Sequence, residues 1–379
     1  MNTFAFIVHP IDPKRDASRK FPLLASLLTA RQINFFSTFF PPLYISEATG
    51  IRSEASGVEV KGWFVACPLT PTRMLELPES TVYRKIVQTG RLAERLGAGL
   101  VGLGAYTSVV GDAGVTIARQ LTVPVTTGDS YTVAIAVQAV REAARVMEIP
   151  LAGATAAVVG ATGAIGAISA QLIARQAPKL WLIGRRTEAL QALRERIMAD
   201  TPAQVEIATD MTPLREADLI LTVTSALESV IEPRHLRPGA VVCDVARPRD
   251  VAAQVAAARD DVLVIDGGMV QVPGDQVALN FDFGFPPGLV YACMAETMAL
   301  ALEGRLESFT LGRQITVGQV QEIEAMANKH GFRLAGFRSF ERAVTTEQIE
   351  RVTEKARAAR RAPLGAPLGA PGSAPGSAG

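Results

Sequence analysis

The second half of the chain alternates short apolar runs with longer amphipathic segments. This alternation predicts parallel strands that are covered by helices on both faces, which makes the chain an α/β protein. Strands are expected at residues 154–159, 179–183, 204–208, 219–223, 240–244 and 262–265. Helices are expected between them, at residues 164–176, 188–199 and 249–258.

The first half of the chain has a less regular pattern. Strands are expected at residues 3–8, 58–66, 99–103 and 123–125, with helices at residues 80–96 and 130–147. After the regular second half, the pattern predicts a long helix at residues 288–303 and a further helical stretch to about residue 359. The chain thus reads as two α/β parts followed by helices.

Residues 22–46 are largely apolar, and five aromatic side chains stand close together in Phe35, Phe36, Phe39, Phe40 and Tyr44. Helical spacing would place Phe36 and Phe40 on one face, with Phe35 and Phe39 on a neighbouring row. Such a face either packs the core of the first domain or lines an apolar slot.

A glycine-rich loop follows the strand expected at residues 154–159. It reads Gly160-Ala161-Thr162-Gly163-Ala164-Ile165-Gly166 and opens the next helix. Glycines after a buried strand allow a tight turn, and the helix N-terminus offers N–H groups to a pyrophosphate. The spacing is Gly-x-x-Gly-x-x-Gly rather than Gly-x-Gly-x-x-Gly, but its βαβ context predicts a Rossmann domain that binds a dinucleotide.

Two arginines follow the second strand of this predicted domain. An NAD-selective site would have an acidic residue there to bind the ribose 2′-hydroxyl, whereas Arg185 and Arg186 suit a 2′-phosphate. We therefore predict NADPH as the cofactor. Thr224 and Gly267 complete the predicted cofactor site.

Composition and charge narrow the class of protein. The 379 residues carry a formal net charge of +1, which gives no basic field for nucleic acid. The three cysteines form no Cys-x-x-Cys pair, so no disulfide framework or metal site is expected. Residues 151–174 carry no charge, but their Gly and Ala content and Gln171 favour a buried strand–turn–helix over a membrane span. The first residues show no signal-peptide pattern, and we expect a cytoplasmic protein.

Cys293 follows Pro286-Pro287-Gly288, which mark the start of a helix. A helix N-terminus lowers the pKa of a thiol and favours the thiolate, so Cys293 is a candidate nucleophile. Spacing alone leaves the alternative that it is an ordinary core residue of an apolar helix.

Several motifs, taken in order, resemble the long-chain acyl-(acyl-carrier-protein) reductases of the cyanobacterial type. Besides the glycine loop, the resemblance spans residues 3–336 and includes Phe6-Ile7-Val8-His9, Tyr106-Thr107-Ser108, Thr126-Thr127-Gly128, Asp266-Gly267-Gly268, Tyr291-Ala292-Cys293-Met294-Ala295-Glu296 and His330-Gly331-Phe332.

This resemblance implies an enzyme that reduces a long-chain acyl thioester to a fatty aldehyde with NADPH. The cysteine that matches Cys293 accepts the acyl group in that family, and His9 is a candidate acid/base or orienting residue. The implied partners are acyl carrier protein or acyl-CoA as substrate and an enzyme that consumes the aldehyde. No transmembrane segment is expected, and peripheral membrane contact stays open.

The sequence departs from the family pattern at two places near the expected site. Asp129-Ser130-Tyr131 stands where the family has Asn-x-His, and Ala246-Arg247-Pro248 replaces a glycine-containing turn. Asp129 and Tyr131 are weaker acid/base candidates. Because both places lie near the expected substrate and nicotinamide, the acyl substrate and the exact reaction can differ from those of the family.

Four parts of the chain are expected from these features. They are an N-terminal α/β substrate domain (1–150), an NADPH-binding Rossmann domain (151–287), a helical segment carrying Cys293 that packs back on the first domain (288–361) and a flexible tail of Ala, Pro, Gly, Ser and Leu (362–379).

Two other functions fit a two-domain layout of this kind. One is an NADP-dependent alcohol dehydrogenase of the shikimate or quinate type, which uses a Lys/Asp pair. The chain lacks an Asn-Val-Thr-x-Pro-x-Lys segment, and neither Lys61 nor Lys85 stands in that context. The other is a non-catalytic NADPH-binding protein.

Overall fold

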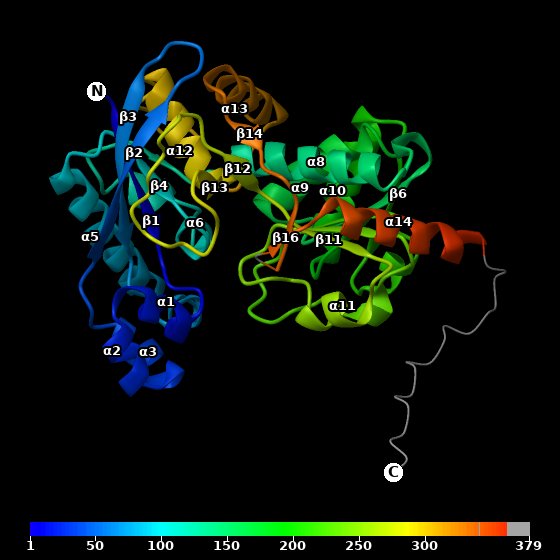
Figure 1. Cartoon of the computed structure of the whole chain (residues 1–379), viewed down its shortest axis with the longest axis horizontal. Coiled ribbons are helices and arrows are strands. Elements are labelled where there is room, and N and C mark those ends of the chain that lie inside the picture. The colour runs from blue at the N-terminus through cyan, green and yellow to red at the C-terminus, as the bar shows by residue number, and fades with distance from the viewer. Residues whose placement is uncertain (341, 362–379) are drawn as a thin grey trace.

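The computed structural model describes residues 1–340 and 342–361, so the predicted tail at 362–379 lies outside the described residues. Two large β-sheets stand side by side, and helices cover them (Figure 1), while two smaller sheets, of three and of two strands, form from later residues. The predicted α/β class is confirmed, and the second sheet is the expected parallel Rossmann-type sheet.

The first sheet has the strand order β2-β3-β1-β4-β5. Its strands are β1 (Thr3–Val8), β2 (Leu43–Arg52), β3 (Glu59–Ala66), β4 (Val101–Leu103) and β5 (Val125–Thr126). All neighbours are parallel except β2 and β3, which form an antiparallel pair at the edge. The sequence did not predict β2, because its alternation is interrupted by shifts in register between Tyr44 and Ser46 and between Ala48 and Ile51.

Seven helices accompany the first sheet. They are α1 (Pro13–Lys20), α2 (Pro22–Leu27), α3 (Ala30–Ser37), α4 (Pro71–Glu76), α5 (Glu79–Leu96), α6 (Tyr106–Val109) and α7 (Val115–Ala118). The predicted helical row of phenylalanines is wrong in part, because α3 ends at Ser37 and leaves Phe39 and Phe40 in the turn before Pro41. A chain cannot readily stay helical into the residue that precedes a proline.

The second sheet has the order β11-β10-β9-β6-β7-β8, with every neighbouring pair parallel. Its strands are β6 (Thr155–Val159), β7 (Lys179–Ile183), β8 (Gln204–Ala208), β9 (Leu219–Thr222), β10 (Val241–Asp244) and β11 (Leu263–Asp266), each within one residue of its predicted bounds. The helices α9 (Ala164–Ala174), α10 (Thr187–Asp200) and α11 (Ala253–Ala258) and the 3-10 turns η1 (Leu151–Gly153), η2 (Thr212–Arg215) and η3 (Pro233–His235) connect them.

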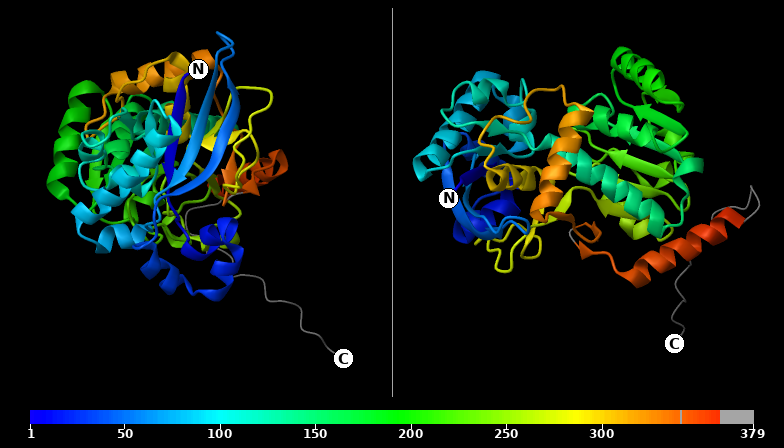
Figure 2. Two further views of the ribbon diagram at one scale, coloured as in Figure 1. Left: turned by 90° about the vertical axis from the view of Figure 1, so that its left-hand side faces the viewer. Right: turned by 90° about the horizontal axis from the view of Figure 1, so that it is seen from above.

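The helix α8 (Asp129–Val146) is the element that both halves share. Thirteen of its residues are buried, and it packs against α9 and β10 on one side and against α12 (Ala292–Glu303) and α13 (Val317–His330) on the other. Figure 2 shows α13, in orange, between the two halves when the molecule is seen from above.

The last third of the described chain contains short strands that the sequence did not predict. They are β12 (Met269–Gln271), β13 (Leu289–Tyr291), β14 (Arg333–Leu334), β15 (Arg338–Ser339) and β16 (Arg342–Ala343), and the helix α14 (Thr346–Arg361) follows them. The helix predicted from residue 288 begins only at Ala292, because β13 pairs with β12 first. Among the described residues, no helix is long and apolar enough to cross a membrane.

Candidate active site

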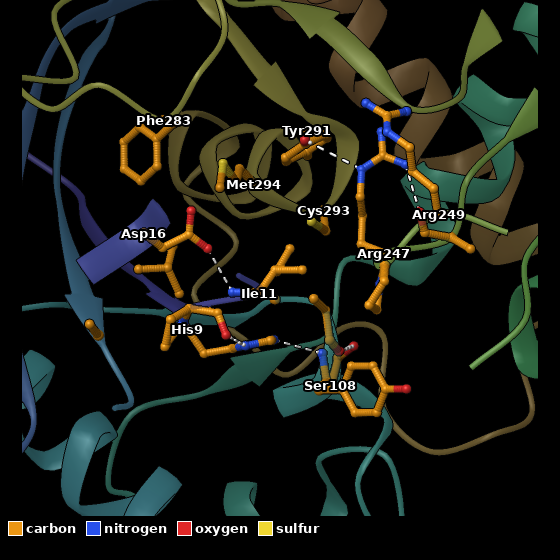
Figure 3. A pocket seen from close by; sticks show the side chains of 18 of the residues that line it. His9, Ile11, Asp16, Ser108, Arg247, Arg249, Phe283, Tyr291, Cys293 and Met294 are labelled. Atoms are coloured by element: carbon orange, nitrogen blue, oxygen red, sulfur yellow. Dashed lines mark hydrogen bonds between the residues drawn. The ribbon is translucent and has the colours of Figure 1, made fainter. Parts of the chain in front are cut away.

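A cavity of about 800 Å³ lies between the two sheets, at the ends of β1, β9 and β10. Its wall combines residues from the first sheet, from α1 and α3, from the loops of the second sheet and from the start of α12. Figure 3 shows His9, Arg247 and Cys293 around this space, although they come from three distant parts of the chain.

The glycine loop stands at the end of β6, the strand at which the order of the second sheet diverges toward β7 on one side and β9 on the other. Open α/β sheets bind their ligands at this switch point. Gly160 has a φ of 81°, and a Cβ atom there would lie 2.5 Å from the carbonyl oxygen of Val223. A Cβ atom at Gly166 would lie 2.3 Å from the oxygen of Gly160, so both positions require glycine.

Gly163 is the N-cap of α9, and no side chain caps this helix. A Cβ atom at Gly163 would meet only the oxygen of Gly160, at 3.3 Å, so the space in front of the helix is open. Ala161 is buried below the turn, Thr162 and Ala164 are partly exposed on it, and Ile165 lines the cavity. The loop therefore has the cradle and the open helix end that a pyrophosphate needs.

Arg185 and Arg186 are exposed beside this loop, just after β7. The Arg186 guanidinium donates a hydrogen bond to the carbonyl oxygen of Thr162 at 3.2 Å, which brings this side chain to the glycine turn. Both positive charges thus stand where a ribose 2′-substituent would lie in this fold.

Thr224 and Gly267 both line the cavity. The Thr224 side chain is already bonded within the protein, because Asp250 accepts hydrogen bonds from the Thr224 hydroxyl and, at 2.8 Å, from its backbone N–H. Asp250 is fully buried and also accepts from Thr222 at 2.6 Å. No motif in the sequence pointed to Asp250, which shapes the cavity wall through Thr224 rather than by facing a ligand.

Cys293 is the second residue of α12 and lines the cavity. A Cβ atom at Gly128 would lie 2.4 Å from the Cα and Cβ atoms of Cys293, so Gly128 permits the close approach of α8 to α12.

The Cys293 thiol does not have the lowered pKa that its place at a helix start predicts. Burial raises the pKa of the Cys293 thiol to about 12, and the neighbouring Asp129 and Glu296 carboxylates add to this. Desolvation and two negative charges outweigh the helix N-terminus.

Asp129 begins α8 and lines the same cavity as Cys293, although it is almost entirely buried. Burial raises the pKa of its carboxyl group to about 7, and the charge of Glu296 contributes to the rise. A carboxyl group that titrates near neutral pH beside a protonated thiol is equipped to accept its proton.

Glu296 lies one turn beyond Cys293 and is fully buried. It accepts hydrogen bonds from the hydroxyls of Thr126 (2.5 Å) and Thr310 (2.8 Å) and from the backbone N–H of Tyr131 (2.9 Å). The glutamate thereby fastens α12 to β5 and α8 and fixes the position of Cys293. The Ala-Cys-x-Ala-Glu motif contained this residue, but the sequence suggested no role for it.

Both ring nitrogens of His9 are occupied by backbone groups. Its Nε2 accepts a hydrogen bond from the N–H of Tyr106 at 3.0 Å, and its Nδ1 lies 3.3 Å from the oxygen of Pro10. Burial lowers the pKa of His9 to about 4, so the ring is neutral. Of the two roles considered for His9, this geometry favours orientation of the loop at Tyr106, whose hydroxyl donates to Ser225 across the cavity at 2.6 Å.

A chain of aromatic rings lines the other side of the cavity. Phe281 and Phe283 lie 4.9 Å apart between ring centroids, Phe283 and Phe285 5.7 Å, and Phe285 and Tyr291 5.4 Å. The sequence reasoning missed these residues, although the alternating Phe281-Asp282-Phe283-Gly284-Phe285 pattern could have revealed them.

The aromatic cluster that the sequence did single out contributes less to the cavity. Phe40 lines it, whereas Phe35, Phe36, Phe39 and Tyr44 are exposed and do not. Tyr131 is also absent from the cavity wall, because its ring is buried in the core behind α8.

Comparison with known proteins gives one match in the middle of the chain and one over most of its length. The model of the family described as Shikimate / quinate 5-dehydrogenase matches residues 141–266, from the end of α8 to the end of β11. The chain is 28% identical over 345 residues to the long-chain acyl-[acyl-carrier-protein] reductase of Synechococcus elongatus, which covers 87% of this chain and 98% of that enzyme. The chain thus has an oxidoreductase-type Rossmann fold and is a distant relative of that reductase.

A second relative is a larger protein. The chain is 32% identical over 304 residues to Aminotransferase PigE of a Serratia species, with 78% of this chain covered. The match takes in 35% of PigE, so the chain spans about a third of that relative's length.

Among solved structures, L-tryptophan dehydrogenase from Nostoc punctiforme covers 94% of this chain with 12% identity and a TM-score of 0.40. The 5-ketofructose reductase of a Gluconobacter strain covers 86% with 11% identity and a TM-score of 0.37.

The two lysines that a shikimate-type reaction could have used lie away from the cavity wall. Lys61 pairs with Glu47 at 2.9 Å, and Lys85 donates to the oxygen of Phe40 at 2.9 Å. The family match over residues 141–266 therefore describes the cofactor half, and neither lysine stands where a hydroxyl substrate would meet the cofactor.

Proposed function

We propose that this protein reduces an acyl thioester to an aldehyde with NADPH, by way of an acyl group held on Cys293. One observation carries the proposal. Among the described residues, Cys293 is the only cysteine in the cavity wall, and it lies between the switch-point edge of the second sheet and the row of aromatic rings. The distant reductase relative supports the same reaction.

The residues present fit a dinucleotide. The open end of α9 would hold the pyrophosphate, and Arg185 and Arg186 would hold a 2′-phosphate. When bound there, NADPH would supply the hydride for the carbonyl carbon of the acyl group. Ile165, Thr224 and Gly267 would shape the wall on this side of the cavity.

The thiol step follows from the pairing of Cys293 with Asp129. As the Cys293 sulfur attacks the thioester carbonyl, its proton passes to the Asp129 carboxylate. The new C–S bond forms, the bond to the carrier sulfur breaks, and the departing thiolate takes the proton from Asp129, which is again a carboxylate. After reduction, the C–S bond to Cys293 breaks, the aldehyde leaves, and the Cys293 thiolate takes up a proton from solvent.

The aromatic row would hold the acyl chain. Phe281, Phe283 and Phe285 give an apolar path that ends at Tyr291, two residues before Cys293. Acyl carrier protein or acyl-CoA would present the thioester, and an aldehyde-consuming enzyme would act next. Neither donor is distinguished by the residues of the wall.

The direct test is to incubate the protein with NADPH and acyl thioesters of carrier protein and of CoA. We expect aldehyde, consumption of NADPH and, with NADPH omitted, a stable acyl group on Cys293 detected by mass spectrometry of its peptide. Binding of NADPH without either product would instead support the non-catalytic alternative. Oxidation of a hydroxy acid with NADP⁺ would support the dehydrogenase alternative.

The aromatic row predicts a preference for long acyl chains. Each buried methylene contributes about 0.8 kcal/mol, so kcat/KM should rise about fourfold per carbon until the slot is full. Phe283→Asp should flatten this rise by placing a charge in the slot, whereas Phe35→Asp, on an exposed ring, should leave it unchanged. Equal kcat/KM for acetyl and long-chain thioesters would refute the slot.

The raised pKa of Asp129 predicts a pH profile. Because the ionised carboxylate is the base, kcat/KM should rise with pH and level off above about 7. Asp129→Asn should lower kcat/KM about a hundredfold and remove that limb of the profile. The exposed Asp210→Asn is the matched control, and a rising limb that survives in Asp129→Asn would show that another group is the base.

Folding stability gives an independent check on this variant. The folded pKa of Asp129 lies above its ordinary value, so between about 4 and 7 the folded protein holds a proton that the unfolded chain has lost. The contribution of Asp129 to the free energy of unfolding therefore falls as the pH rises through this window. Asp129→Asn should be relatively more stable at pH 8 than the wild type, which separates its loss of activity from misfolding.

A further inference from the structure

The helices α1, α2 and α3 project from the end of the first sheet, away from both sheets (Figure 1). We call residues 12–44, which contain these helices, the helical cap. Its exposed apolar side chains are unusually many: Phe21, Leu23, Leu27, Phe35, Phe36, Phe39, Phe40 and Tyr44 all belong to it. Leu23 and Leu27 are 80% and 81% exposed and Phe39 is 70% exposed, so these side chains stand almost wholly in water.

The charge of the helical cap is as distinctive as its apolar surface. Five basic residues (Lys14, Arg15, Arg19, Lys20 and Arg31) and two acidic ones (Asp12 and Asp16) give it a net charge of +3, against +1 for the whole chain. Both acidic side chains bond to backbone at the start of α1. Asp12 accepts from the N–H groups of Lys14 and Arg15 at 3.0 and 2.9 Å, and Asp16 from those of Ile11 and Asp12 at 2.8 and 2.9 Å.

The inner side of the helical cap forms one wall of the cavity. Ala17, Phe21, Ile33 and Phe40 line the cavity from the cap, together with the basic residues Arg15, Arg19 and Lys20, whereas Lys14 and Arg31 do not. The helices α1 and α3 and the turn after α3 thus separate the space around Cys293 from the exposed apolar surface.

We propose that the helical cap binds the surface of an anionic lipid bilayer. Protruding Leu and Phe side chains enter the boundary between headgroups and acyl chains, while the exposed Lys14 and Arg31 side chains meet the lipid phosphates. A lipid surface is favoured over a folded partner because the most exposed side chains are large and apolar, on α2, on α3 and in the turn after α3, and because Lys14 and Arg31 add exposed positive charge to the same cap. The proposed lipid-binding surface is inferred from the helical cap alone. Its purpose, the delivery of an apolar aldehyde from the cavity into the bilayer, rests on the proposed function.

The test is co-sedimentation of the full chain with vesicles. We expect binding to vesicles of phosphatidylcholine with phosphatidylglycerol, and about tenfold weaker binding to phosphatidylcholine alone or at high salt. Phe36→Ser/Phe39→Ser should weaken binding to the anionic vesicles at least about tenfold, and Lys14→Gln/Arg31→Gln should reduce it and its salt dependence. Leu306→Ser/Met198→Ser removes two comparably exposed side chains outside the cap and should change nothing.

Three outcomes would overturn the proposal. They are no binding to anionic vesicles, equal binding by the wild type and Phe36→Ser/Phe39→Ser, and binding of an acidic carrier protein through the cap without any binding of lipid. A concentration-dependent dimer that the same variant abolishes, with no lipid binding, would assign the cap to a second copy of the chain. Reductase assays in detergent-free solution with short-chain thioesters report separately on Cys293, so the failure of either proposal leaves the other measurable.

Discussion

Replacing Cys293 with serine should reduce aldehyde formation by about a thousandfold or more, because the acyl group then has no thiol to accept it. The Asp129 carboxyl titrates near neutral pH and suits a thiol better than a serine hydroxyl, whose proton is held far more tightly. The affinity for NADPH should stay within about twofold of the wild type, since the glycine loop belongs to the other sheet. Steady-state aldehyde production and NADPH fluorescence titration measure the two effects.

The other two cysteines provide the controls. Cys67 and Cys243 are fully buried, and burial raises the pKa of Cys67 to about 11 and that of Cys243 to about 12. Cys67→Ala and Cys243→Ala should retain most of the activity. Normal turnover in Cys293→Ser would show that this thiol is a packing residue and would move the dehydrogenase alternative ahead.

Exchanging both arginines after β7 should change the choice of cofactor. Arg185→Gln/Arg186→Gln should weaken NADPH about 10- to 100-fold, since a charge-assisted hydrogen bond contributes about 1.5–3 kcal/mol, and should leave NADH almost unaffected. Fluorescence titration with both cofactors measures the ratio of the two dissociation constants.

A matched pair of arginines exists on the other half of the molecule. Arg91 and Arg95 are exposed on α5, so Arg91→Gln/Arg95→Gln changes the net charge equally without touching the glycine loop. This control should bind both cofactors as the wild type does. An equal loss for NADPH and NADH in Arg185→Gln/Arg186→Gln would contradict the 2′-phosphate assignment.

The regular half of the fold could be predicted from the sequence because its signals are local. The strands β6, β9, β10 and β11 are short buried runs, and the glycine loop follows β6 directly. The edge strand β2 and the pair β12–β13 escaped prediction, because their pairing depends on segments distant in the sequence and on interruptions of their alternation.

The site was predictable only in part, for the same reason. Cys293 could be singled out by its motif, but its raised pKa depends first on burial and then on Asp129, which lies 164 positions earlier and comes near it only in the folded chain. The sequence offered Phe35–Tyr44 as either core packing or the wall of an apolar slot, whereas in the structure Phe281, Phe283 and Phe285 form most of the aromatic wall. A run of phenylalanines does not reveal whether it faces inward or outward.

The buried Glu296 also has a consequence for the order of co-translational folding. The second sheet is contiguous from Thr155 to Asp266, so its strands can pair as soon as that stretch has emerged. The hydrogen bonds of Thr126 and of the start of α8 to Glu296 cannot form until Glu296 has been synthesised, 170 residues after Thr126. The nascent chain should therefore complete its cofactor half first and acquire a positioned thiol only after Glu296 has emerged.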